Sequence, residues 1–408
     1  MQILWISHFL LFPETGYGGL QRSRNLLKVL IKYHDVHLIC YYRNIDKNFV
    51  QDIKLAERDL KKYCKNVYII PHELGSIQKA FLLLKSIITR TPYSAYIYRS
   101  RQLLKQSLEL ISDKSIDLVH SDTIGMIEPI LDKIGVIKVL THHDVESHKM
   151  YRRYENEENV LRRIFYLQEH TSIKKYEKKY CRKFDLNIAV SDMDKGRLEE
   201  IDEGINVGVI QNGVDCEYFK YSPRNAMSRE LIFTGALDYY PNAKAMLYFF
   251  GKIWPILKSK YPELKVTIIG KHPPAQLHSF GRDCNDINIL GYVDDIRPHV
   301  QRAKVFICPI LEGGGTRIKI LDAFSQGIPV VSTIVGAEGL DLENGKHILL
   351  ADTIAEFVDR VSDLLENDEL SKRMSLFARK FVEENYSYNI IGKKMATVYN
   401  GMVKNNVR

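Results

Sequence analysis

The residues with the clearest capacity for chemistry form one short run, Glu312-Gly313-Gly314-Gly315-Thr316-Arg317-Ile318-Lys319. The run follows a strand-like apolar segment and precedes a segment with helical spacing. Consecutive glycines let the backbone approach a ligand, and the free N–H groups at the start of a helix attract anions. Arg317 and Lys319 add positive charge. We therefore expect a phosphate to bind here, with a helix that begins near Thr316.

Asp322 falls two turns along the same predicted helix, where its carboxylate could accept hydrogen bonds from a pair of sugar hydroxyls. The competing interpretation is a glycine-rich turn followed by an acidic side chain on a helix surface. The run is not a P-loop, because the patterns GxxxxGKS and GxxxxGKT are absent. The earlier loop Gly16–Gly19 is not a dinucleotide fingerprint, because Gln21 stands at its third glycine position. A mobile turn explains that loop as well as ligand contact does.

Other histidines and acids lack the spacing of a metal site. His142, His143 and His148 lie near Asp144 without a zinc-type pattern. The segment 192–194 reads Asp-Met-Asp, but it follows a serine where a strand meets a helix, and acids there stabilise the helix start. We expect a helix cap at this segment and no bound metal.

The elements that position these residues alternate between strands and helices. Continuous apolar strands separated by helices indicate parallel sheets covered on both faces. The fold class is therefore α/β, with two doubly wound domains that meet near residues 200–210. Ligands of such sheets bind beyond the carboxyl ends of the strands. We predict strands at 3–6, 36–40, 116–120, 137–141, 185–190, 207–210, 231–234, 265–269, 304–308 and 328–332.

Length and composition fit this organisation. The chain has 408 residues and a mass of 47.3 kDa, which suits two domains. With 45% hydrophobic and 26% charged residues, it is neither fibrous nor intrinsically disordered. It shows no secretory signal and no apolar stretch of ~18–20 residues, and its six cysteines form no CxxC pair. We expect a cytoplasmic protein with reduced thiols.

The net charge of +8 is concentrated in residues 149–183, which hold 11 Lys and Arg against 5 Asp and Glu. Paired basic residues alternate there with aromatic ones. Such a helical segment suits an anionic surface formed by lipid headgroups, nucleic acid or a phosphorylated acceptor. Nucleic acid is the weakest of these, because no recognition motif accompanies the segment. The alternative is a solvated helix face with its aromatic side chains in the core.

The run at 312–323 resembles the donor-site signature of retaining glycosyltransferases of family 4, as do Gly327–Thr333 and Gly336–Leu340. The segments 233–238 and 291–295 resemble two further motifs of their second domain. In the first half, Gly18-Gly19 and His143-Asp144-Val145-Glu146 are similar to the acceptor-side loop and the strand-end histidine of the family. The resemblance spans the whole chain.

The resemblance implies the GT-B fold, which consists of two facing Rossmann-like domains. It implies an acceptor-binding domain at residues 1–205, a nucleotide-sugar-binding domain at 206–388, and a C-terminal helix at 389–408 that returns to the first domain. The implied donor-binding residues are Gly18, Gly19, Gly235, Gly270, Val293, Glu312, Gly313, Gly314, Gly315, Thr316 and Asp322.

Two positions depart from the family pattern. The family commonly has two glutamates separated by seven residues, whereas Glu312 and Asp322 are separated by nine. If Asp322 is aligned with the second acid, Gly314 occupies the first position, as in a GGGTR subgroup where the second acid binds the ribose. The arginine that commonly follows Gly235 is Ala236 here. We hypothesise that Arg317 and Lys319 replace its charge, with Lys244 as a weaker candidate.

The implied reaction is metal-independent, cofactor-free transfer of a hexose from a nucleotide sugar, with retention at the anomeric carbon. Arg317 and Lys319 would stabilise the leaving diphosphate, and His143 would position the donor sugar. A structural strand-end role and a general-base role are the alternatives for His143. The implied acceptor is a glycan or a lipid-linked sugar in surface polysaccharide or glycolipid synthesis, used at the inner face of the cell membrane. The rival functions are a nucleotide-sugar epimerase and a non-catalytic GT-B-like subunit.

Overall fold

The computed structural model describes residues 1–12, 18–42, 49–222, 229–282, 284–312 and 316–406. The chain divides into two compact units. Unit 1 comprises Met1–Gln211 and Ile391–Arg408, and unit 2 comprises Asn212–Ile390. The sequence placed its domain boundaries after residues 205 and 388, close to these divisions.

Unit 1 contains a parallel sheet of seven strands in the order β3-β2-β1-β4-β5-β6-β7. The strands are β1 (Gln2–Ser7), β2 (Asp35–Tyr42), β3 (Asn66–Pro71), β4 (Leu118–Ser121), β5 (Ile137–Thr141), β6 (Leu186–Ala189) and β7 (Val207–Val209). The sequence predicted all of them except β3. That strand pairs with β2 alone and is only partly buried, so it lacks the continuous apolar run of the inner strands.

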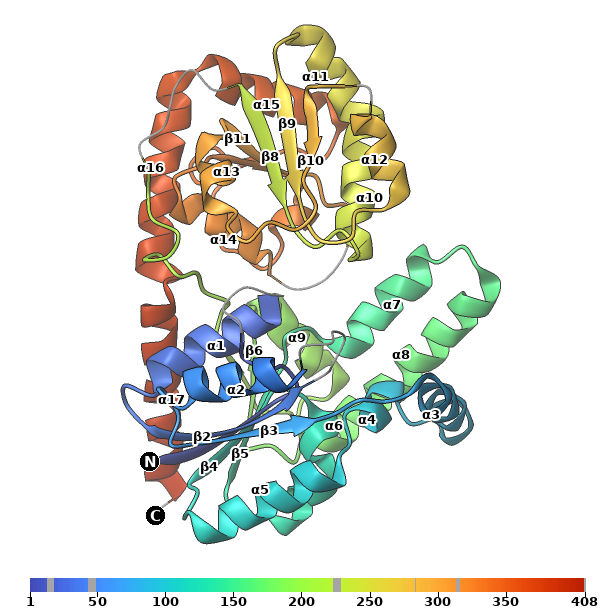
Figure 1. The fold of residues 1–408 in the computed structure, drawn as a ribbon, viewed down its shortest axis with the longest axis vertical. Coiled ribbons are helices and arrows are strands. Elements are labelled where there is room, and N and C mark those ends of the chain that lie inside the picture. The colour runs from blue at the N-terminus through green and yellow to red at the C-terminus, as the bar shows by residue number, and fades with distance from the viewer. Residues whose placement is uncertain (13–17, 43–48, 223–228, 283, 313–315, 407–408) are drawn as a thin grey trace. The chain divides into compact units, whose positions relative to one another are not determined.

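Helices cover the sheet of unit 1 (Figure 1). They are α1 (Gly18–Leu30), α2 (Phe49–Leu60), α3 (Ser76–Thr89), α4 (Tyr93–Ile97), α5 (Arg101–Asp113), α6 (Ile124–Ile127), η1 (Glu128–Lys133), α7 (Glu146–Asn156), α8 (Val160–Cys181), α9 (Asp192–Ile201) and α17 (Tyr388–Asn406). The start of α9 confirms the predicted cap, because the Ser191 hydroxyl accepts a hydrogen bond from the Asp194 N–H at 3.1 Å.

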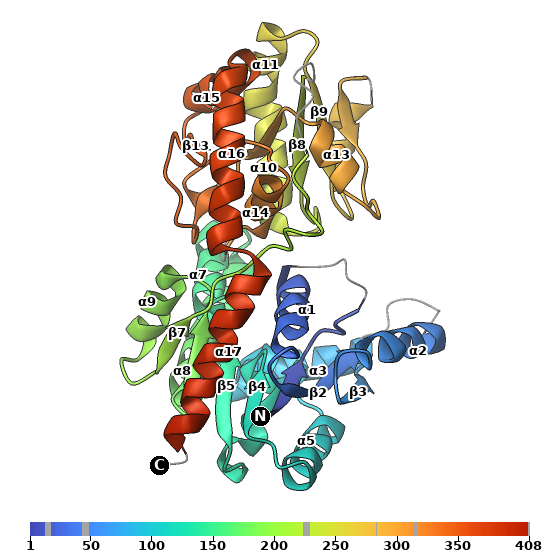
Figure 2. The same ribbon diagram turned by 90° about the vertical axis from the view of Figure 1, so that its left-hand side faces the viewer.

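The C-terminal helix α17 packs on unit 1 (Figure 2). A side chain at Gly392 would collide with Val29 of α1, so glycine allows the two helices to approach closely. Further along, the buried Tyr399 hydroxyl hydrogen-bonds the Nδ1 atom of His120 on β4. The last helix therefore returns to the first domain, as the sequence resemblance implied.

Unit 2 contains a parallel sheet of six strands in the order β10-β9-β8-β11-β12-β13. The strands are β8 (Glu230–Thr234), β9 (Lys265–Ile269), β10 (Ile287–Ile289), β11 (Val305–Cys308), β12 (Val330–Ser332) and β13 (Leu349–Leu350). The sequence predicted all of them except β10, whose middle residue Asn288 is exposed, and β13, which has two residues, so neither carries a continuous buried apolar run.

The helices of unit 2 include α14, which begins at Ile318 with Arg317 as its N-cap residue. Its start lies slightly later than the predicted start near Thr316, because Arg317 still has non-helical backbone angles. The full set is α10 (Tyr240–Tyr248), η2 (Phe249–Ile253), α11 (Trp254–Lys260), α12 (Ala275–Gly281), α13 (Arg297–Arg302), α14 (Ile318–Ser325), η3 (Val335–Ala337), α15 (Ile354–Glu366) and α16 (Asp368–Asn385).

Both sheets reverse their strand order at one place, between β1 and β4 in unit 1 and between β8 and β11 in unit 2. Crevices outside the carboxyl ends of strands at such a reversal are where open α/β sheets bind ligands. The six cysteines are free thiols. Within the residues that the model describes, no helix is both long and apolar enough to cross a lipid bilayer.

Candidate active site

In unit 2, Lys319 lies directly beside the end of β8. Its ammonium donates a hydrogen bond to the Asn242 Oδ1 atom at 2.8 Å, and the Asn242 amide donates another to the Ala236 carbonyl at 2.8 Å. Gly235 makes room for this arrangement, since a Cβ there would overlap the Lys319 ammonium. Its φ of 157° also lies where glycine is favoured. A fixed cation thus stands next to Ala236, where the family commonly has an arginine.

The environment of Lys319 is only partly polar. Its ammonium lies 4.1 Å from the centroid of the Phe233 ring, a cation–π contact. The pKa of Lys319 is lowered to about 8, chiefly by burial and in part by the charge of Arg317, against the opposing effects of Cys308 and Asp322. Because an anionic ligand favours the charged form of a lysine, a bound phosphate would raise this pKa again.

Asp322 shows the complementary effect. Burial raises the pKa of its carboxyl to about 8, and the charge of Asp215 adds to the rise, while Lys319 opposes it. Perturbed titratable groups at a carboxyl edge of a parallel sheet are typical of ligand sites.

Glu312 is the third predicted acidic or basic group at this edge. Its Oε1 atom lies 3.2 Å from the Lys244 ammonium, and only 12% of its side chain is exposed. Lys244 is therefore already paired with a carboxylate, which makes it a weaker phosphate ligand than Lys319. Arg317 is 7% exposed. Gly313, Gly314 and Gly315 lie outside the described residues, and Thr316 directly follows them.

Gly270 follows β9 at the same edge. A Cβ on Gly270 would collide with the Gly235 carbonyl oxygen, so the two loops pass each other at a distance that only glycine allows. The Gly270 N–H donates to the Gly291 carbonyl at 2.8 Å. Val293 packs its side chain against the core of unit 2. The predicted donor-side positions Gly235, Gly270 and Lys319 are thus brought together.

In unit 1, His143 stands beside a buried carboxylate that the sequence analysis missed. Asp122 directly follows β4, and its side chain is 0% exposed. Its Oδ1 atom lies 3.7 Å from the Nε2 atom of His143 and 3.3 Å from that of His120. The other oxygen, Oδ2, accepts hydrogen bonds from the Ser23 hydroxyl at 3.1 Å and the Trp5 indole at 3.4 Å. Its position after a predicted strand was the signal that could have found it.

The carboxylate of Asp122 remains charged despite its burial. Burial raises its pKa, but hydrogen bonds from His120 and His143 and their positive charge outweigh this effect, so the pKa of Asp122 lies well below its usual range. A charged acceptor can orient a neighbouring imidazole. The arrangement therefore fixes His143 while leaving 18% of its side chain exposed.

The glycine loop of unit 1 reaches the same histidine. A Cβ on Gly19 would lie 3.0 Å from the Phe9 ring and 3.5 Å from the Nδ1 atom of His143. Gly18 is the first residue of α1. The two predicted features of this domain, the glycine loop and the strand-end histidine, are therefore adjacent.

His142 does not belong to this cluster. Its Nε2 atom hydrogen-bonds the Asn187 side chain at 3.1 Å, and burial lowers its pKa to about 4. In the part of the chain that the model describes, no three His, Cys, Asp or Glu side chains are grouped as metal ligands would be.

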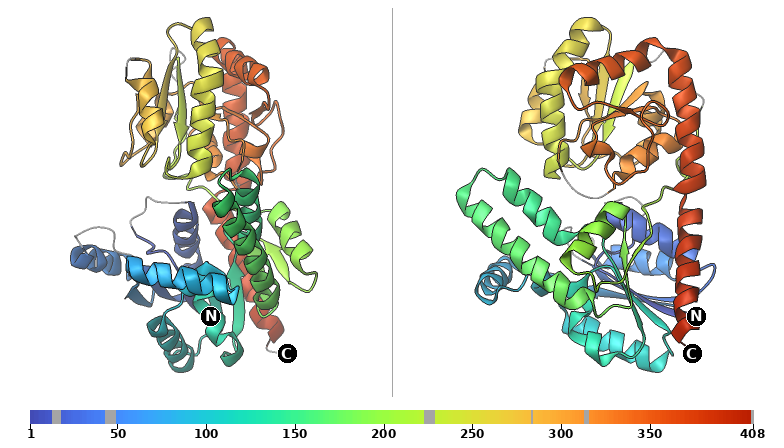
Figure 3. Two further views of the ribbon diagram at one scale, coloured as in Figure 1. Left: turned by 90° about the vertical axis from the view of Figure 1, so that its right-hand side faces the viewer. Right: turned by 180° about the vertical axis from the view of Figure 1, so that it is seen from behind.

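The basic aromatic segment 149–183 forms the antiparallel helices α7 and α8 (Figure 3). In the outer part, Arg163 stacks over Tyr154 at 4.8 Å and Arg153 lies 5.9 Å from the Tyr166 ring. The inner part matches the alternative, because Tyr176 and Tyr180 pack against the core of unit 1.

Comparison with known proteins identifies the family. A sequence model of the family described as Glycosyltransferase Family 4 matches residues 17–218. A second family model, described as Glycosyl transferases group 1, matches residues 228–367. The two matches cover most of both units. The chain belongs to glycosyltransferase family 4. The resemblance drawn from the sequence motifs is thereby confirmed.

Solved glycosyltransferase structures share the GT-B fold of this family 4 member. A sucrose-phosphate synthase from Thermosynechococcus elongatus superposes with a TM-score of 0.73 at 12% identity, covering 98% of this chain and 99% of that one. HepE from Anabaena, solved with UDP and glucose, gives a TM-score of 0.68 at 15% identity, with 98% and 100% covered. A Klebsiella pneumoniae protein described as an uncharacterized 44.6 kDa protein in the cps region is 25% identical over 92% of this chain and 94% of its own length.

Proposed function

We propose that this family 4 glycosyltransferase is a retaining, metal-independent enzyme that moves a hexose from a nucleoside diphosphate sugar to a glycan or lipid-linked acceptor. The observation that carries the proposal is Lys319, which Asn242 holds beside the carboxyl end of β8 with Asp322 on the same helix. The solved complexes of HepE with UDP and glucose support a nucleotide-sugar donor. The Klebsiella relative in a cps region supports a role in surface polysaccharide or glycolipid synthesis.

The chemistry follows from charge. As the bond between sugar and diphosphate breaks, negative charge develops on the leaving phosphate oxygens, and preorganised cations stabilise it. Lys319 and Arg317 would supply this charge. Asp322 would accept hydrogen bonds from the ribose hydroxyls, and these bonds would favour its ionised form against the burial that raises its pKa. A bound nucleotide would thus change the protonation of Asp322.

His143 would contact the donor sugar and position it. The hydrogen-bonding capacity of Asp122 and the close approach of Gly19 hold its ring in one orientation. In this proposal a phosphate oxygen of the donor accepts the proton of the acceptor hydroxyl, so no general base is required from the protein. We further propose that the enzyme acts at the inner face of the cell membrane, with residues 149–183 near the lipid.

A thermal-shift series tests the donor site. UDP, GDP, ADP and CMP are each added with and without magnesium to the wild type and to Asp322→Ala. A ligand at ~100 times its dissociation constant stabilises a protein by roughly 2.7 kcal/mol. We expect one nucleoside diphosphate to shift the wild type without magnesium and to fail on the variant. No shift with any nucleotide would contradict a donor site in unit 2.

Product stereochemistry tests the reaction itself. The nucleotide that stabilises the protein names the base of the donor, and the corresponding sugar nucleotides are then incubated with candidate acceptors. Proton NMR of the product should show the anomeric configuration of the donor. An inverted product would refute the retaining mechanism, and nucleotide release that never depends on an acceptor would refute transfer.

A further inference from the structure

Helix α3 is apolar and yet lies almost entirely in solvent. Its sequence contains two lysines and no acid, and Ser86 is its one fully buried residue. Ile77, Phe81, Leu84 and Ile88 recur at helical spacing and are 57 to 89% exposed. Such a contiguous apolar surface on a soluble domain normally meets a partner that is itself apolar.

The neighbouring helix α8 extends this surface. Val160, Leu161, Ile164 and Leu167 on its first turns are also exposed. The Gln168 amide donates a hydrogen bond to the Ile87 carbonyl at 3.2 Å, which fixes α8 against α3. Figures 1 and 3 show the two helices side by side in unit 1. We call these exposed side chains of α3 and α8 the apolar face.

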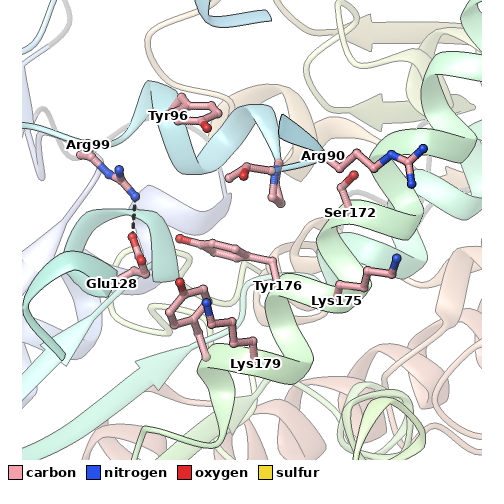
Figure 4. A pocket seen from close by; sticks show the side chains of 11 residues that line it. Arg90, Tyr96, Arg99, Glu128, Ser172, Lys175, Tyr176 and Lys179 are labelled. Carbon is pink, nitrogen blue, oxygen red and sulfur yellow. Dashed lines mark hydrogen bonds and ion pairs between the residues drawn. The ribbon is translucent and has the colours of Figure 1, made fainter. Parts of the chain in front are cut away.

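A basic cavity of about 310 Å³ opens where α3 ends, between α4 and α8 (Figure 4). Its lining includes the cations Arg90, Arg99, Lys175 and Lys179. The single carboxylate of the lining, Glu128, is bonded to Arg99 at 2.6 Å. A net positive charge therefore remains for a guest, and hydroxyl and phenol groups of the lining can donate further hydrogen bonds.

Arg90 connects the apolar face with the cavity. It is the C-cap of α3 and adopts a left-handed conformation with a φ of 52°. Glycine or asparagine takes this conformation at lower cost. The arginine at this position places a cation in the cavity wall immediately after the apolar helix.

The pKa of Tyr96, one of the tyrosines that line the cavity, reflects the positive charges nearby. Burial raises the pKa of Tyr96, but hydrogen bonds from Thr89 and Thr91 and the charges of Lys85 and Arg99 outweigh it, so the net pKa is lowered. The Lys85 ammonium lies 4.8 Å from the centroid of the Tyr96 ring. The field around Tyr96 thus favours negative charge, whereas burial and the charge of Glu128 raise the pKa of Tyr176 deeper in the lining.

We propose that the apolar face inserts into the surface layer of an anionic membrane and that the basic cavity binds the phosphate of a lipid headgroup. At 14 residues, α3 is about 21 Å long, which suits a helix lying in the interface rather than across the bilayer. Lys79 and Lys85 can extend along the helix to the headgroups. A second copy of the same face would bring these cations against one another, so charge complementarity favours lipid over a homodimer.

This inference extends the proposed membrane role of residues 149–183 and rests on that part of the proposed function. It can fail separately from the donor site, because nucleotide-induced thermal shifts report on unit 2 and vesicle binding reports on unit 1. Both are measured on every variant below. A variant that keeps its nucleotide shift retains its donor site, and an unchanged far-UV circular dichroism spectrum shows that unit 1 is folded as well.

The first experiment tests the apolar face. The full chain is sedimented with phosphatidylcholine vesicles and with vesicles that also contain phosphatidic acid. We expect binding to the anionic vesicles, weakened by salt. The triple variant Ile77→Ser/Phe81→Ser/Ile88→Ser should bind at least about tenfold more weakly. Leu376→Ser/Phe377→Ser on α16, whose side chains are 49% and 43% exposed, is the matched control and should bind like the wild type. Equal binding of all three proteins would overturn the proposal.

A tryptophan reporter tests insertion directly. Both native tryptophans, Trp5 and Trp254, are buried, so Phe81→Trp adds an exposed one. Brominated lipid chains should quench this tryptophan and leave Phe377→Trp unquenched. Equal quenching of the Phe81→Trp and Phe377→Trp variants would show that α3 does not insert into the membrane. A wild type that is dimeric without lipid, and that Phe81→Ser converts to a monomer, would show that a second copy covers the face instead.

The last experiment tests the cavity. Arg90→Gly keeps the left-handed turn while removing a charge, and it is combined with Lys175→Gln and Lys179→Gln. Binding to phosphatidic acid vesicles should fall by roughly fivefold for each charge removed, and free glycerol phosphate should compete with the wild type. Lys105→Gln/Lys195→Gln, elsewhere on unit 1, is the control. In a further set of vesicles, oleate replaces phosphatidic acid at matched surface charge, so that these vesicles carry no phosphate monoester. If the cavity variant loses oleate binding to the same extent, the cavity holds no headgroup phosphate and that part of the proposal is wrong.

Discussion

Asp122 of unit 1 and Asp322 of unit 2 lie at corresponding edges of two similar sheets, yet their surroundings shift their pKa values in opposite directions. Asp122 accepts hydrogen bonds from imidazole, indole and hydroxyl groups, and these keep its pKa low although it is fully buried. Asp322 gains too little from Lys319 to offset burial, so its pKa rises to about 8.

The difference separates a completed polar network from an incomplete one. A buried carboxylate whose partners are all present stabilises its surroundings and orients them. A buried carboxylate without them costs stability, which a ligand can recover by supplying the missing partners. By this criterion Asp122 stabilises the fold of unit 1, whereas Asp322 is placed to bind a ligand of unit 2. The predictions below test this contrast, from the largest expected effect to the smallest.

Asp122→Asn should give the largest loss of stability. Removing one partner of a buried charged pair costs about 3–5 kcal/mol, and the neutral amide removes the negative charge that faces His120 and His143. Because the folded pKa is depressed, the contribution of Asp122 is present above its ordinary pKa of 3.8 and is lost as the pH falls through the lower folded pKa. Urea unfolding at neutral and acidic pH measures this. The variant and the wild type should converge in acid, and a difference that persists there would argue against a charged Asp122.

Lys319→Ala should give the largest loss of turnover in unit 2. Removing one preorganised group that stabilises developing charge costs about 10²–10³-fold in kcat. Lys244→Ala is the control and should cost less than about tenfold, because Glu312 already neutralises that lysine. Measuring kcat for donor turnover in both variants tests this expectation. If the two losses were equal, the assignment of Lys319 as the replacement for the missing arginine would fail.

Asp322→Asn should stabilise the free protein while weakening nucleotide binding. The folded pKa is raised from 3.8 to about 8, so the unfolded chain ionises first and stability falls as the pH rises between these values. The amide of the variant does not ionise, so the stability of the variant does not fall in this way. Its unfolding free energy should exceed that of the wild type by almost nothing near pH 4, and the excess should grow by up to roughly 1.4 kcal/mol for each pH unit toward pH 8. Thermal unfolding across this range, with and without nucleotide, provides the check; a variant less stable than the wild type at pH 8 would remove the contrast.

Tyr399→Phe should have the smallest effect. It removes the hydroxyl that joins α17 to His120, at a cost of about 1 kcal/mol. Turnover should change little, because Asp122 still holds His143 directly. Urea unfolding and donor kinetics are compared with those of Asp122→Asn. A loss of turnover as large as that of Asp122→Asn would show that the C-terminal helix, and not the carboxylate, sets the orientation of His143.

The sequence by itself determined the α/β class, the inner strands and the family. These depend on local features, since an apolar run of four or five residues predicts a buried strand and a glycine-rich run predicts a close backbone approach. The two domains, the edge at 309–319 and His143 at the end of β5 all followed from such patterns. Outer strands such as β3 and β10 did not, because a partly buried or very short strand leaves no clear pattern.

Only the tertiary structure decided which polar groups meet. Asn242 and Lys319 are 77 residues apart in the chain, and His120 and Tyr399 are 279 apart. Of two adjacent histidines, it turned His143 toward Asp122 and His142 toward Asn187. It also left the apolar side of α3 uncovered. Residue type and spacing state what a side chain can do, but partners and burial, which set its pKa and its accessibility, depend on how distant segments pack together.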